Sequence, residues 1–397
     1  MCGIIGYVGR ENAVPIIVEG LKKLEYRGYD SAGLAVYTDD GFEVVKKKGR
    51  LSVLEAEIEQ NPLSGFVGIG HTRWATHGEP SNENSHPHLG HQNKIAVVHN
   101  GIIENYKKLR AKLTAKGVEF TSETDSEVIA QMAEYYYEGD IMETVIKVAN
   151  RLEGSYALGI MCLDEPDKLI AIKKDNPLII GVSENGNFIA SDIPAVLKHT
   201  STVYYMEDKE IAIIQKDKVE FYNIDKELIN KEPETITWSV DSAEKGGYPH
   251  FMLKEITEQP RVLQDTINSV LQAGANKAVI DSIDINSFNK VVITACGSAY
   301  NAGVVSRYVF EKLCRMTVEV DLASEFRYKD AIIDDKTLVI LISQSGETAD
   351  TIAAMREAKA KGAKTLSIVN VIGSTIAKET DYTIYTDRKS TRLNSSH

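Results

Sequence analysis

The chain has 397 residues, of which 43% are hydrophobic and 26% charged, and its formal net charge is −12. This length exceeds one ordinary domain and the composition is typical of a globular enzyme, so two or more folded units are expected. The acidic balance argues against a protein that binds nucleic-acid phosphates along a basic stripe, although a few donors could still hold a small anion.

The first 240 residues group strands and helices in runs, which favours layered sheets with helices outside. Two apolar runs flank Asp39-Asp40-Gly41 and predict a hairpin. Strands are predicted at 2–8, 66–72, 95–99, 155–163, 168–173, 178–182 and 188–191, with further short ones between about 200 and 240. Helices are predicted at 12–24, 103–116 and 126–152.

A different pattern follows residues 241–249, a polar stretch with glycine and proline that is the best linker candidate. After it, strands alternate with helices, which predicts a parallel sheet with helices on both faces. The strands are expected at 290–295, 337–342 and 364–370, and the helices at 250–273, 299–313 and 347–361. The last ten residues, 388–397, show no apolar period and are interpreted as a non-native tail.

Cysteine use and hydropathy indicate a cytoplasmic protein. Cys2, Cys162, Cys296 and Cys314 are too few and too scattered for a disulfide framework, and no CxxC pair suggests zinc or redox chemistry. The first residues do not resemble a secretory signal, and no stretch approaches the ~18 apolar residues of a membrane span. We therefore expect a reducing compartment, in which Cys2 is a free thiol.

Cys2 would become the first residue if the initiator methionine were removed. Its thiol and its own α-amine would then lie on neighbouring atoms, and such an amine has a pKa of roughly 7.7–8.0, suitable for a general base near neutral pH. A nucleophile of this kind needs no His–Asp pair. Taken alone, Cys2 is more simply interpreted as a small buried side chain at the start of a strand.

An acyl-transfer site also needs an oxyanion hole and groups that hold the two charged ends of an amino acid. Asn100 and Gly101 could supply the oxyanion donors, or form a tight hairpin turn. Arg73 could grip a carboxylate, or make a surface ion pair. Asp125 could hold an ammonium, or cap the helix that follows it.

Six of the nine histidines lie between His71 and His99. His86, His88 and His91 could suggest a metal site, but metal sites usually combine such a cluster with Asp, Glu or Cys ligands at defined spacing. The surrounding segment, NENSHPHLGHQN, is typical of a loop. We interpret it as lining the active site.

Five motifs in order resemble those of the class II glutamine amidotransferases: Met1–Gly6, Glu25–Gly33, His71–Pro80, His99–Glu104 and Ser122–Glu127. The resemblance implies an α+β N-terminal-nucleophile hydrolase fold over residues 2–240, with two stacked sheets between helices (αββα). It implies that Cys2 is the nucleophile and that Asn100 and Gly101 stabilise the oxyanion. The implied glutamine-binding residues are Arg73 for the α-carboxylate, Asp125 for the α-amine, and Thr76, His77, His99 and Trp74, of which Trp74 would gate the ammonia route.

Two further loops are suited to an anion. Ser343–Thr348 lies where a strand ends and a helix begins, and the unpaired N–H groups of such a position attract a phosphate. Gly297-Ser298 makes the matching corner at the end of the preceding strand, where open α/β sheets bind ligands. Such serines and threonines could also be simple helix caps. No GxGxxG or GxxxxGK[ST] loop occurs, so dinucleotide and ATP sites are not expected.

These loops resemble the sugar-isomerase (SIS) domain of glutamine-dependent sugar-phosphate aminotransferases, which would place a linker and connecting helix at 241–273 and a first SIS domain at 274–387. Fructose 6-phosphate would be held by Gly297, Ser298, Ser343, Gln344, Ser345 and Thr348. The family usually has Thr-Ser at Ser298-Ala299, which puts Ala299 in doubt as a contact. The implied reaction forms glucosamine 6-phosphate and glutamate without a metal or organic cofactor, in a cytoplasmic protein that is a homodimer at full length.

The family continues into a second SIS domain, which carries the lysine of isomerisation and a catalytic glutamate and histidine. The sequence stops before it, so we expect the chain as written to retain only glutaminase activity. Two alternatives stay open. Another class II amidotransferase would need a phosphoribosyl-diphosphate or ATP-binding partner domain, and residues 290–387 show neither signature. A non-catalytic phosphosugar-binding regulator would leave the amino-terminal cysteine and the glutamine-binding set unexplained.

Overall fold

The computed structural model describes residues 2–25, 28, 30–236, 248, 251–271, 274–371 and 374–386. The chain divides into two compact units, Met1–Thr237 and Trp238–His397. The predicted linker at 241–249 lies almost wholly outside the described residues, and the predicted tail at 388–397 lies entirely outside them. The finer domain boundaries therefore stay predictions.

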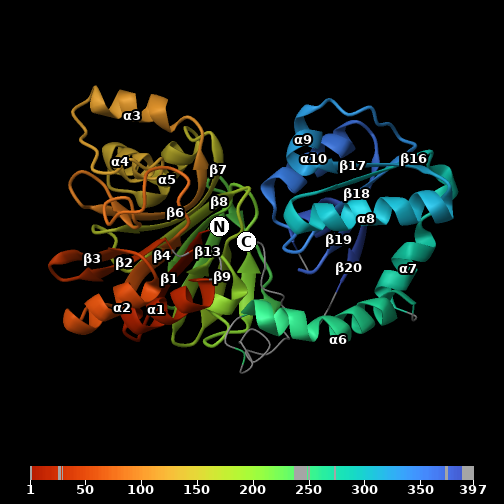
Figure 1. Ribbon diagram of the computed structural model, residues 1–397. Coiled ribbons are helices and arrows are strands. Elements are labelled where there is room, and N and C mark those ends of the chain that lie inside the picture. The colour runs from red at the N-terminus through yellow and green to blue at the C-terminus, as the bar shows by residue number, and fades with distance from the viewer. Residues whose placement is uncertain are drawn as a thin grey trace. The chain divides into compact units, whose positions relative to one another are not determined.

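Two antiparallel sheets make up the centre of the first unit (Figure 1). The first sheet has the order β15 (Glu234–Thr235), β11 (Thr202–Tyr205), β9 (Ile179–Ser183), β10 (Gly186–Ala190), β1 (Gly3–Gly9), β4 (Val67–Arg73), β2 (Ser31–Thr38) and β3 (Gly41–Lys48). The second has the order β14 (Leu228–Ile229), β13 (Lys218–Tyr222), β12 (Ile211–Gln215), β8 (Leu169–Lys174), β7 (Gly154–Cys162), β6 (Ile95–Ile103) and β5 (His88–Leu89).

The side chains of β6 show why these sheets stack between helices. Ala96 and Val98 belong to the apolar cluster between the two sheets, whereas Ile95 and Val97 belong to the cluster under the helices. Since successive strand residues point to opposite faces, a strand that is apolar at every position is covered on both sides. The covering helices of the second sheet are α3 (Tyr106–Thr114), α4 (Glu127–Tyr136) and α5 (Ile141–Ala149). The predicted αββα class is confirmed.

Helix α1 (Ala13–Leu24) packs on the outer face of the first sheet, with α2 (Leu51–Gln60) beside it (Figure 1). The last turn of α1 contacts the start of β1. A Cβ atom at Gly3 would lie 2.7 Å from Leu24 Cβ and 2.7 Å from Thr72 Oγ1. Only glycine fits this close approach, which holds the beginning of β1, and therefore Cys2, against the end of β4.

The hairpin predicted around Asp39-Asp40-Gly41 is confirmed, because β2 and β3 pair with Thr38 opposite Gly41. The single helix predicted at 126–152 is wrong. The segment forms α4 and α5, separated at Gly139, which adopts φ +98°, and at Asp140, whose side chain accepts a hydrogen bond from Glu143 N and caps α5. A left-handed glycine followed by an N-cap residue ends one helix and starts another.

The second unit contains a parallel sheet with the order β17 (Thr317–Leu322), β16 (Lys290–Ala295), β18 (Thr337–Ser343), β19 (Lys364–Val369) and β20 (Tyr382–Tyr385). Its helices are α6 (Phe251–Leu271), α7 (Ala275–Ser282), α8 (Gly297–Cys314), α9 (Ala323–Tyr328), α10 (Ala349–Ala360) and α11 (Thr375–Glu379). Phe310 of α8 packs on one face of the sheet, whereas Phe326 of α9 and Met355 of α10 pack on the other. The predicted parallel sheet with helices on both faces is confirmed.

Short 3₁₀ helices occur at Ile193–Ala195 in the first unit and at Ile285–Ser287 in the second. Among the described residues, none of the helices combines the length and apolar character needed to cross a bilayer.

Candidate active site

Cys2 directly precedes β1 and lies beside the end of β4. The main-chain N–H of Trp74 donates to Cys2 Sγ at 3.3 Å, and the thiol approaches the Trp74 carbonyl oxygen at 3.6 Å. Burial raises the pKa of the Cys2 thiol above its ordinary value, and the hydrogen bond with Trp74 offsets part of this effect. The thiol is therefore protonated at neutral pH, so nucleophilic attack requires a base.

Asn100 and Gly101 lie within β6, which continues to Ile103 instead of ending at residue 99. Asn100 is opposite Ala157 and Gly101 is opposite Tyr156 on β7, so the alternative of a hairpin turn at Asn100-Gly101 is wrong. Asn100 Nδ2 donates to the carbonyl oxygen of Cys2 at 3.1 Å. The structure thus brings the predicted amide donor to the predicted nucleophile, across the two sheets.

Gly101 adopts φ +133°, a conformation that side chains rarely permit. A Cβ atom at this position would lie 2.1 Å from the carbonyl oxygen of Ser155. This backbone geometry therefore requires glycine next to Asn100.

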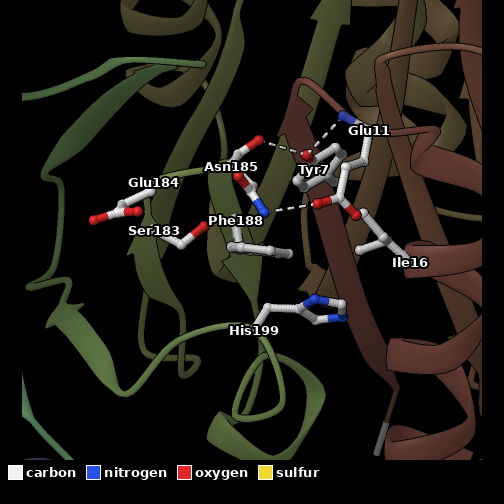
Figure 2. Close-up of a pocket in the computed structure, with 8 residues that line it drawn as sticks. All are labelled: Tyr7, Glu11, Ile16, Ser183, Glu184, Asn185, Phe188 and His199. Atoms are coloured by element: carbon white, nitrogen blue, oxygen red, sulfur yellow. Dashed lines mark hydrogen bonds between the residues drawn. The ribbon is translucent and has the colours of Figure 1, made fainter.

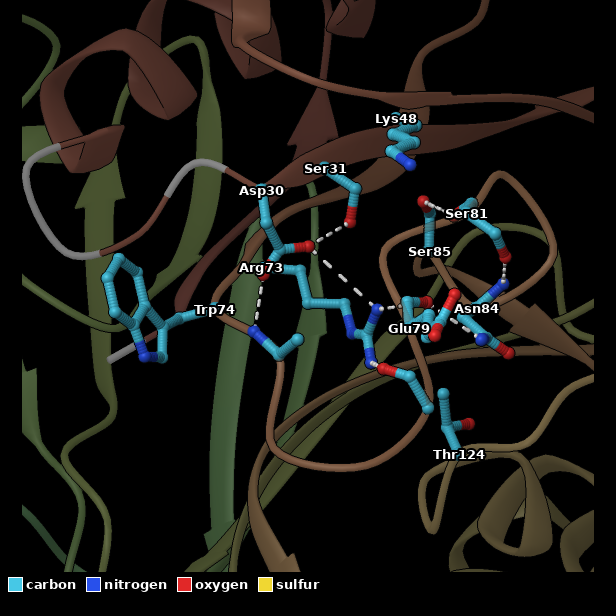
Figure 3. Close-up of polar contacts among 12 residues, drawn as sticks. Asp30, Ser31, Lys48, Arg73, Trp74, Glu79, Ser81, Asn84, Ser85 and Thr124 are labelled. Carbon is cyan, nitrogen blue, oxygen red and sulfur yellow. Dashed lines mark hydrogen bonds and ion pairs between the residues drawn. The ribbon is translucent and has the colours of Figure 1, made fainter.

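Arg73, at the end of β4, is buried and holds the loop that follows it (Figure 3). Its Nη2 donates to the carbonyl oxygens of His77 and of Gly78, the latter at 3.0 Å, and its Nη1 lies 3.8 Å from Asp30 Oδ1. Asp30 also accepts from the N–H of Ala75. Arg73 is therefore no surface ion pair, and its guanidinium and Asp30 together shape the loop beside Cys2.

Asp30 received no role from the sequence, although it lies in the Glu25–Gly33 motif. Tyr26, Arg27 and Tyr29 of that motif lie outside the described residues. The sequence offered one signal for Asp30, an acidic residue inside the motif. Its partners Arg73 and Ala75 are more than 40 positions away, and only the fold brings them to Asp30.

Asp125 is buried, and its Oδ2 accepts from the main-chain N–H of Ile103 at 2.8 Å. Its other oxygen lies 3.7 Å from His77 Nδ1. Ser126, not Asp125, is the N-cap residue of α4, so the helix-cap alternative for Asp125 is wrong. The carboxylate instead joins β6 to the loop that Arg73 holds.

The remaining predicted glutamine-binding residues lie on or near that loop. Thr76 is exposed, and its hydroxyl lies 3.3 Å from His77 Nδ1. The side chain of Trp74 is 51% exposed. His99 is buried on β6 and its Nδ1 lies 2.8 Å from Ser126 Oγ.

Four of the clustered histidines are buried and contact one another, and one of them, His71, also contacts the side chain of Asn100. The rings of His71 and His86 stack with centroids 4.1 Å apart, and His88 and His99 contact the same group. Burial lowers the pKa of all four, for His71 to about 3, so they are neutral at physiological pH. Within the described residues, no group of three His, Cys, Asp or Glu side chains is arranged to hold a metal. His91 lies apart and is exposed.

In the second unit, the two predicted phosphate corners follow β16 and β18, which are adjacent and parallel. From β16 the chain passes to β17 on one side, and from β18 it passes to β19 on the other. The carboxyl ends of two such strands form a topological switch point, where open α/β sheets bind ligands. Gly297 and Ser298 are exposed there at the start of α8.

The loop after β18 is organised by its own hydroxyls. Ser343 Oγ is buried, accepts from Gly346 N at 3.1 Å and lies 3.1 Å from Thr348 Oγ1. Ser345 Oγ accepts from Glu347 N at 3.2 Å. Thr348 is the N-cap residue of α10 but makes no side-chain cap bond. Ser343 therefore shapes the loop, while Gln344, Ser345 and Thr348 are only partly buried.

A pocket with a volume of about 310 Å³ lies in the first unit, and none of the predicted site residues lines it (Figure 2). Glu11, Asn185 and Tyr7 are linked along one wall by hydrogen bonds, including Tyr7 Oη to the Asn185 carbonyl oxygen at 2.7 Å. His199 stacks on Phe188 at 5.3 Å.

Both units of the chain are similar to known protein families. Residues 71–198 match the glutamine amidotransferase domain family, and residues 284–394 match the SIS domain family. The chain is 56% identical over 390 residues to the glutamine–fructose-6-phosphate aminotransferase (isomerizing) of Clostridium acetobutylicum, covering 97% of this chain and 64% of that protein. The protein of the same name from Aquifex aeolicus is 48% identical over 388 residues, with the same shares covered.

Among solved structures, the glutamine phosphoribosylpyrophosphate amidotransferase from B. subtilis superposes with a TM-score of 0.52 at 17% identity, over 97% of this chain and 91% of that one. This likeness concerns the fold alone. The chain spans 64% of the length of the aminotransferases named above. It is a relative of the glutamine–fructose-6-phosphate aminotransferases and contains a glutamine amidotransferase domain followed by a SIS domain.

Proposed function

We propose that the first unit hydrolyses glutamine with Cys2 as nucleophile, and that the whole protein passes the ammonia to fructose 6-phosphate to form glucosamine 6-phosphate. One observation carries the first part: Asn100 Nδ2 reaches the main chain of Cys2 at 3.1 Å. A side-chain amide donor beside Cys2 supports the proposal, because acyl transfer needs a donor near the oxyanion that forms on the carbon attacked by the sulfur.

The chemistry begins with removal of Met1, which frees the α-amine of Cys2 to accept the proton of the thiol. The sulfur then attacks the γ-carboxamide carbon of glutamine, and the amide oxygen becomes an oxyanion held by Asn100 Nδ2 and the N–H of Gly101. When the C–N bond breaks, the α-ammonium returns its proton to the leaving nitrogen, so that ammonia departs and a thioester remains. Water, activated by the amine, hydrolyses the thioester to glutamate and restores the thiol.

For substrate recognition we propose Arg73 for the α-carboxylate of glutamine and Asp125 for its α-amine. Both side chains are buried and charged, and His77 connects them, since the His77 carbonyl oxygen accepts from Arg73 and its ring faces Asp125. A buried charge is stabilised by an opposite charge, which favours a zwitterionic amino acid here. Thr76, Trp74 and His99 would line the same pocket.

For the second unit we propose that Gly297, Ser298 and Ser343–Thr348 hold the phosphate and hydroxyls of fructose 6-phosphate. Support comes from the switch point between β16 and β18 and from the main-chain N–H groups at the start of α8 and α10. Amination of the sugar and a homodimeric assembly are proposed for the whole protein. A reducing cytoplasm is proposed as well, because Cys2 must stay a thiol to act as the nucleophile.

The glutaminase proposal is tested by measuring glutamate released from glutamine. The Cys2→Ala variant should release none above background, whereas Cys314→Ser, which changes an exposed cysteine of the second unit, should keep the wild-type rate. Intact-mass spectrometry should show the active preparation without Met1. Glutamate release by Cys2→Ala, or by a preparation that retains Met1, would contradict the assignment of the nucleophile.

The sugar-phosphate proposal is tested by calorimetric titration with fructose 6-phosphate. Ser345→Ala should weaken binding, whereas Ser306→Ala, which removes a partly buried hydroxyl bonded to Ala302 within α8, should not. Equal binding by the wild type and Ser345→Ala would remove Ser345 from the site. Light scattering of the whole protein would check the proposed homodimer.

A further inference from the structure

His71 contacts the oxyanion donor without being part of it. It lies fully buried on β4, and its Nε2 is 3.0 Å from Asn100 Oδ1 and 3.0 Å from the carbonyl oxygen of His99. Both oxygens are acceptors, so His71 Nε2 carries a hydrogen that the two oxygens share.

The orientation of the Asn100 amide is therefore determined at both ends. Its Oδ1 accepts from His71, and its Nδ2 donates to the carbonyl oxygen of Cys2 at 3.1 Å. If the amide turned by half a revolution, Nδ2 would face the N–H of His71 and Oδ1 would face the Cys2 carbonyl oxygen. Both contacts would then be repulsive.

The ring of His71 is itself held in place and uncharged. It stacks on His86 at 4.1 Å, with 12° between the ring planes. Its Nδ1 has no hydrogen-bond partner among the described residues, and burial lowers the pKa of His71 to about 3. The ring thus acts as a neutral donor through Nε2 alone.

We propose that His71 is a positioning residue for the oxyanion hole, which keeps Nδ2 of Asn100 turned toward the oxyanion by binding Oδ1 on the opposite side of the amide. The inference rests on the proposed glutaminase function. His71 acts through Asn100 and is not among the residues proposed to touch the charged ends of glutamine. Its loss should therefore lower kcat and leave KM for glutamine nearly unchanged, because the oxyanion exists only in the reacting state.

The test compares two replacements of His71. In His71→Gln the side-chain amide can still donate at the position of Nε2, so kcat should stay within about fivefold of the wild type. His71→Met has a similar length but no donor, and kcat should fall about 100-fold, as expected when an oxyanion donor is misdirected. In both variants KM should change by less than about twofold, and circular dichroism and the rate of Cys2 alkylation by iodoacetamide should match the wild type.

A double-mutant cycle separates positioning from a structural role. Asn100→Ala removes the group that His71 orients, so adding His71→Met to it should cause no further loss of kcat. Losses that multiply would overturn the proposal, because His71 would then act independently of Asn100. Equal impairment of the Gln and Met variants, or full activity of the Met variant, would also overturn it.

A second readout does not require turnover. Glutamate γ-semialdehyde forms a thiohemiacetal with a thiol and creates the oxyanion without a leaving group. His71→Met should weaken its binding about 100-fold and leave glutamate binding unchanged. A wild type that binds the aldehyde tightly but releases no glutamate would contradict the glutaminase proposal alone, and the variants would still test the role of His71. A wild type that neither binds the aldehyde nor turns over glutamine would overturn both proposals.

Discussion

We expect the first unit to lose stability as the pH falls from 7 to 4.5, because four histidines are buried in it without charge. His71, His86, His88 and His99 are each at most 4% exposed, and burial is the largest cause of the lowered pKa in every case. An unfolded histidine binds a proton near its ordinary pKa of 6.5, whereas folded His71 does so only near pH 3.

The direction of the effect follows from proton uptake. Between pH 6.5 and pH 3 the unfolded state binds more protons than the folded state, so the free energy of unfolding decreases as the pH decreases. The contribution of His71 is complete above pH 6.5 and is lost progressively below it. From its two pKa values, His71 alone accounts for about 2.5 kcal/mol lost between pH 7 and pH 4.5. The other three histidines act in the same direction.

The assay is urea unfolding at the two pH values. Unfolding is monitored by hydrogen exchange of peptides from β4 and β6, so that the first unit is measured separately. His71→Gln cannot titrate, so it should lose about 2.5 kcal/mol less than the wild type over this range. His91→Gln, which changes an exposed histidine, should behave as the wild type. Equal losses for the wild type and His71→Gln would refute the reasoning.

Three further predictions concern backbone and core. Gly101→Ala should lower kcat for glutamate release by at least about 100-fold, because a Cβ there meets a carbonyl oxygen 2.1 Å away and shifts the oxyanion N–H; a variant with unchanged kcat would remove Gly101 from the site. Gly346 adopts φ +66°, and a Cβ atom added there would lie 2.1 Å from Ser374 Oγ. The strain of Gly346→Ala, about 1–3 kcal/mol, should weaken fructose 6-phosphate binding by about tenfold or more in calorimetry. Equal affinity would show that the loop does not hold the sugar. Phe326→Ala should destabilise the second unit by about 3–5 kcal/mol in denaturant unfolding, because the ring is fully buried. Its control Phe66→Ala, 60% exposed in the first unit, should change stability by less than about 0.5 kcal/mol.

Local patterns were sufficient for the types and approximate bounds of most elements. Periodicity predicted α1, the β2–β3 hairpin and the alternation of strands and helices in the second unit, because the burial of one face imposes a repeat on neighbouring residues. The edge strand β17 and the short helix α9 were not predicted. Their pattern is weaker, because an edge strand and a short helix bury less of their surface.

The sequence by itself determined the chemical types available to the site: a thiol next to the chain start, an amide followed by glycine, a cation and an anion. Only the tertiary structure decided which of them meet. Asn100 lies 98 positions from Cys2, and an Asn-Gly pair typical of a turn became part of β6 because β7 pairs with it. His71 and Asp30 acquired partners in the same way. Hydrogen bonds between strands distant in the chain depend on the order of strands in a sheet, which no local periodicity records.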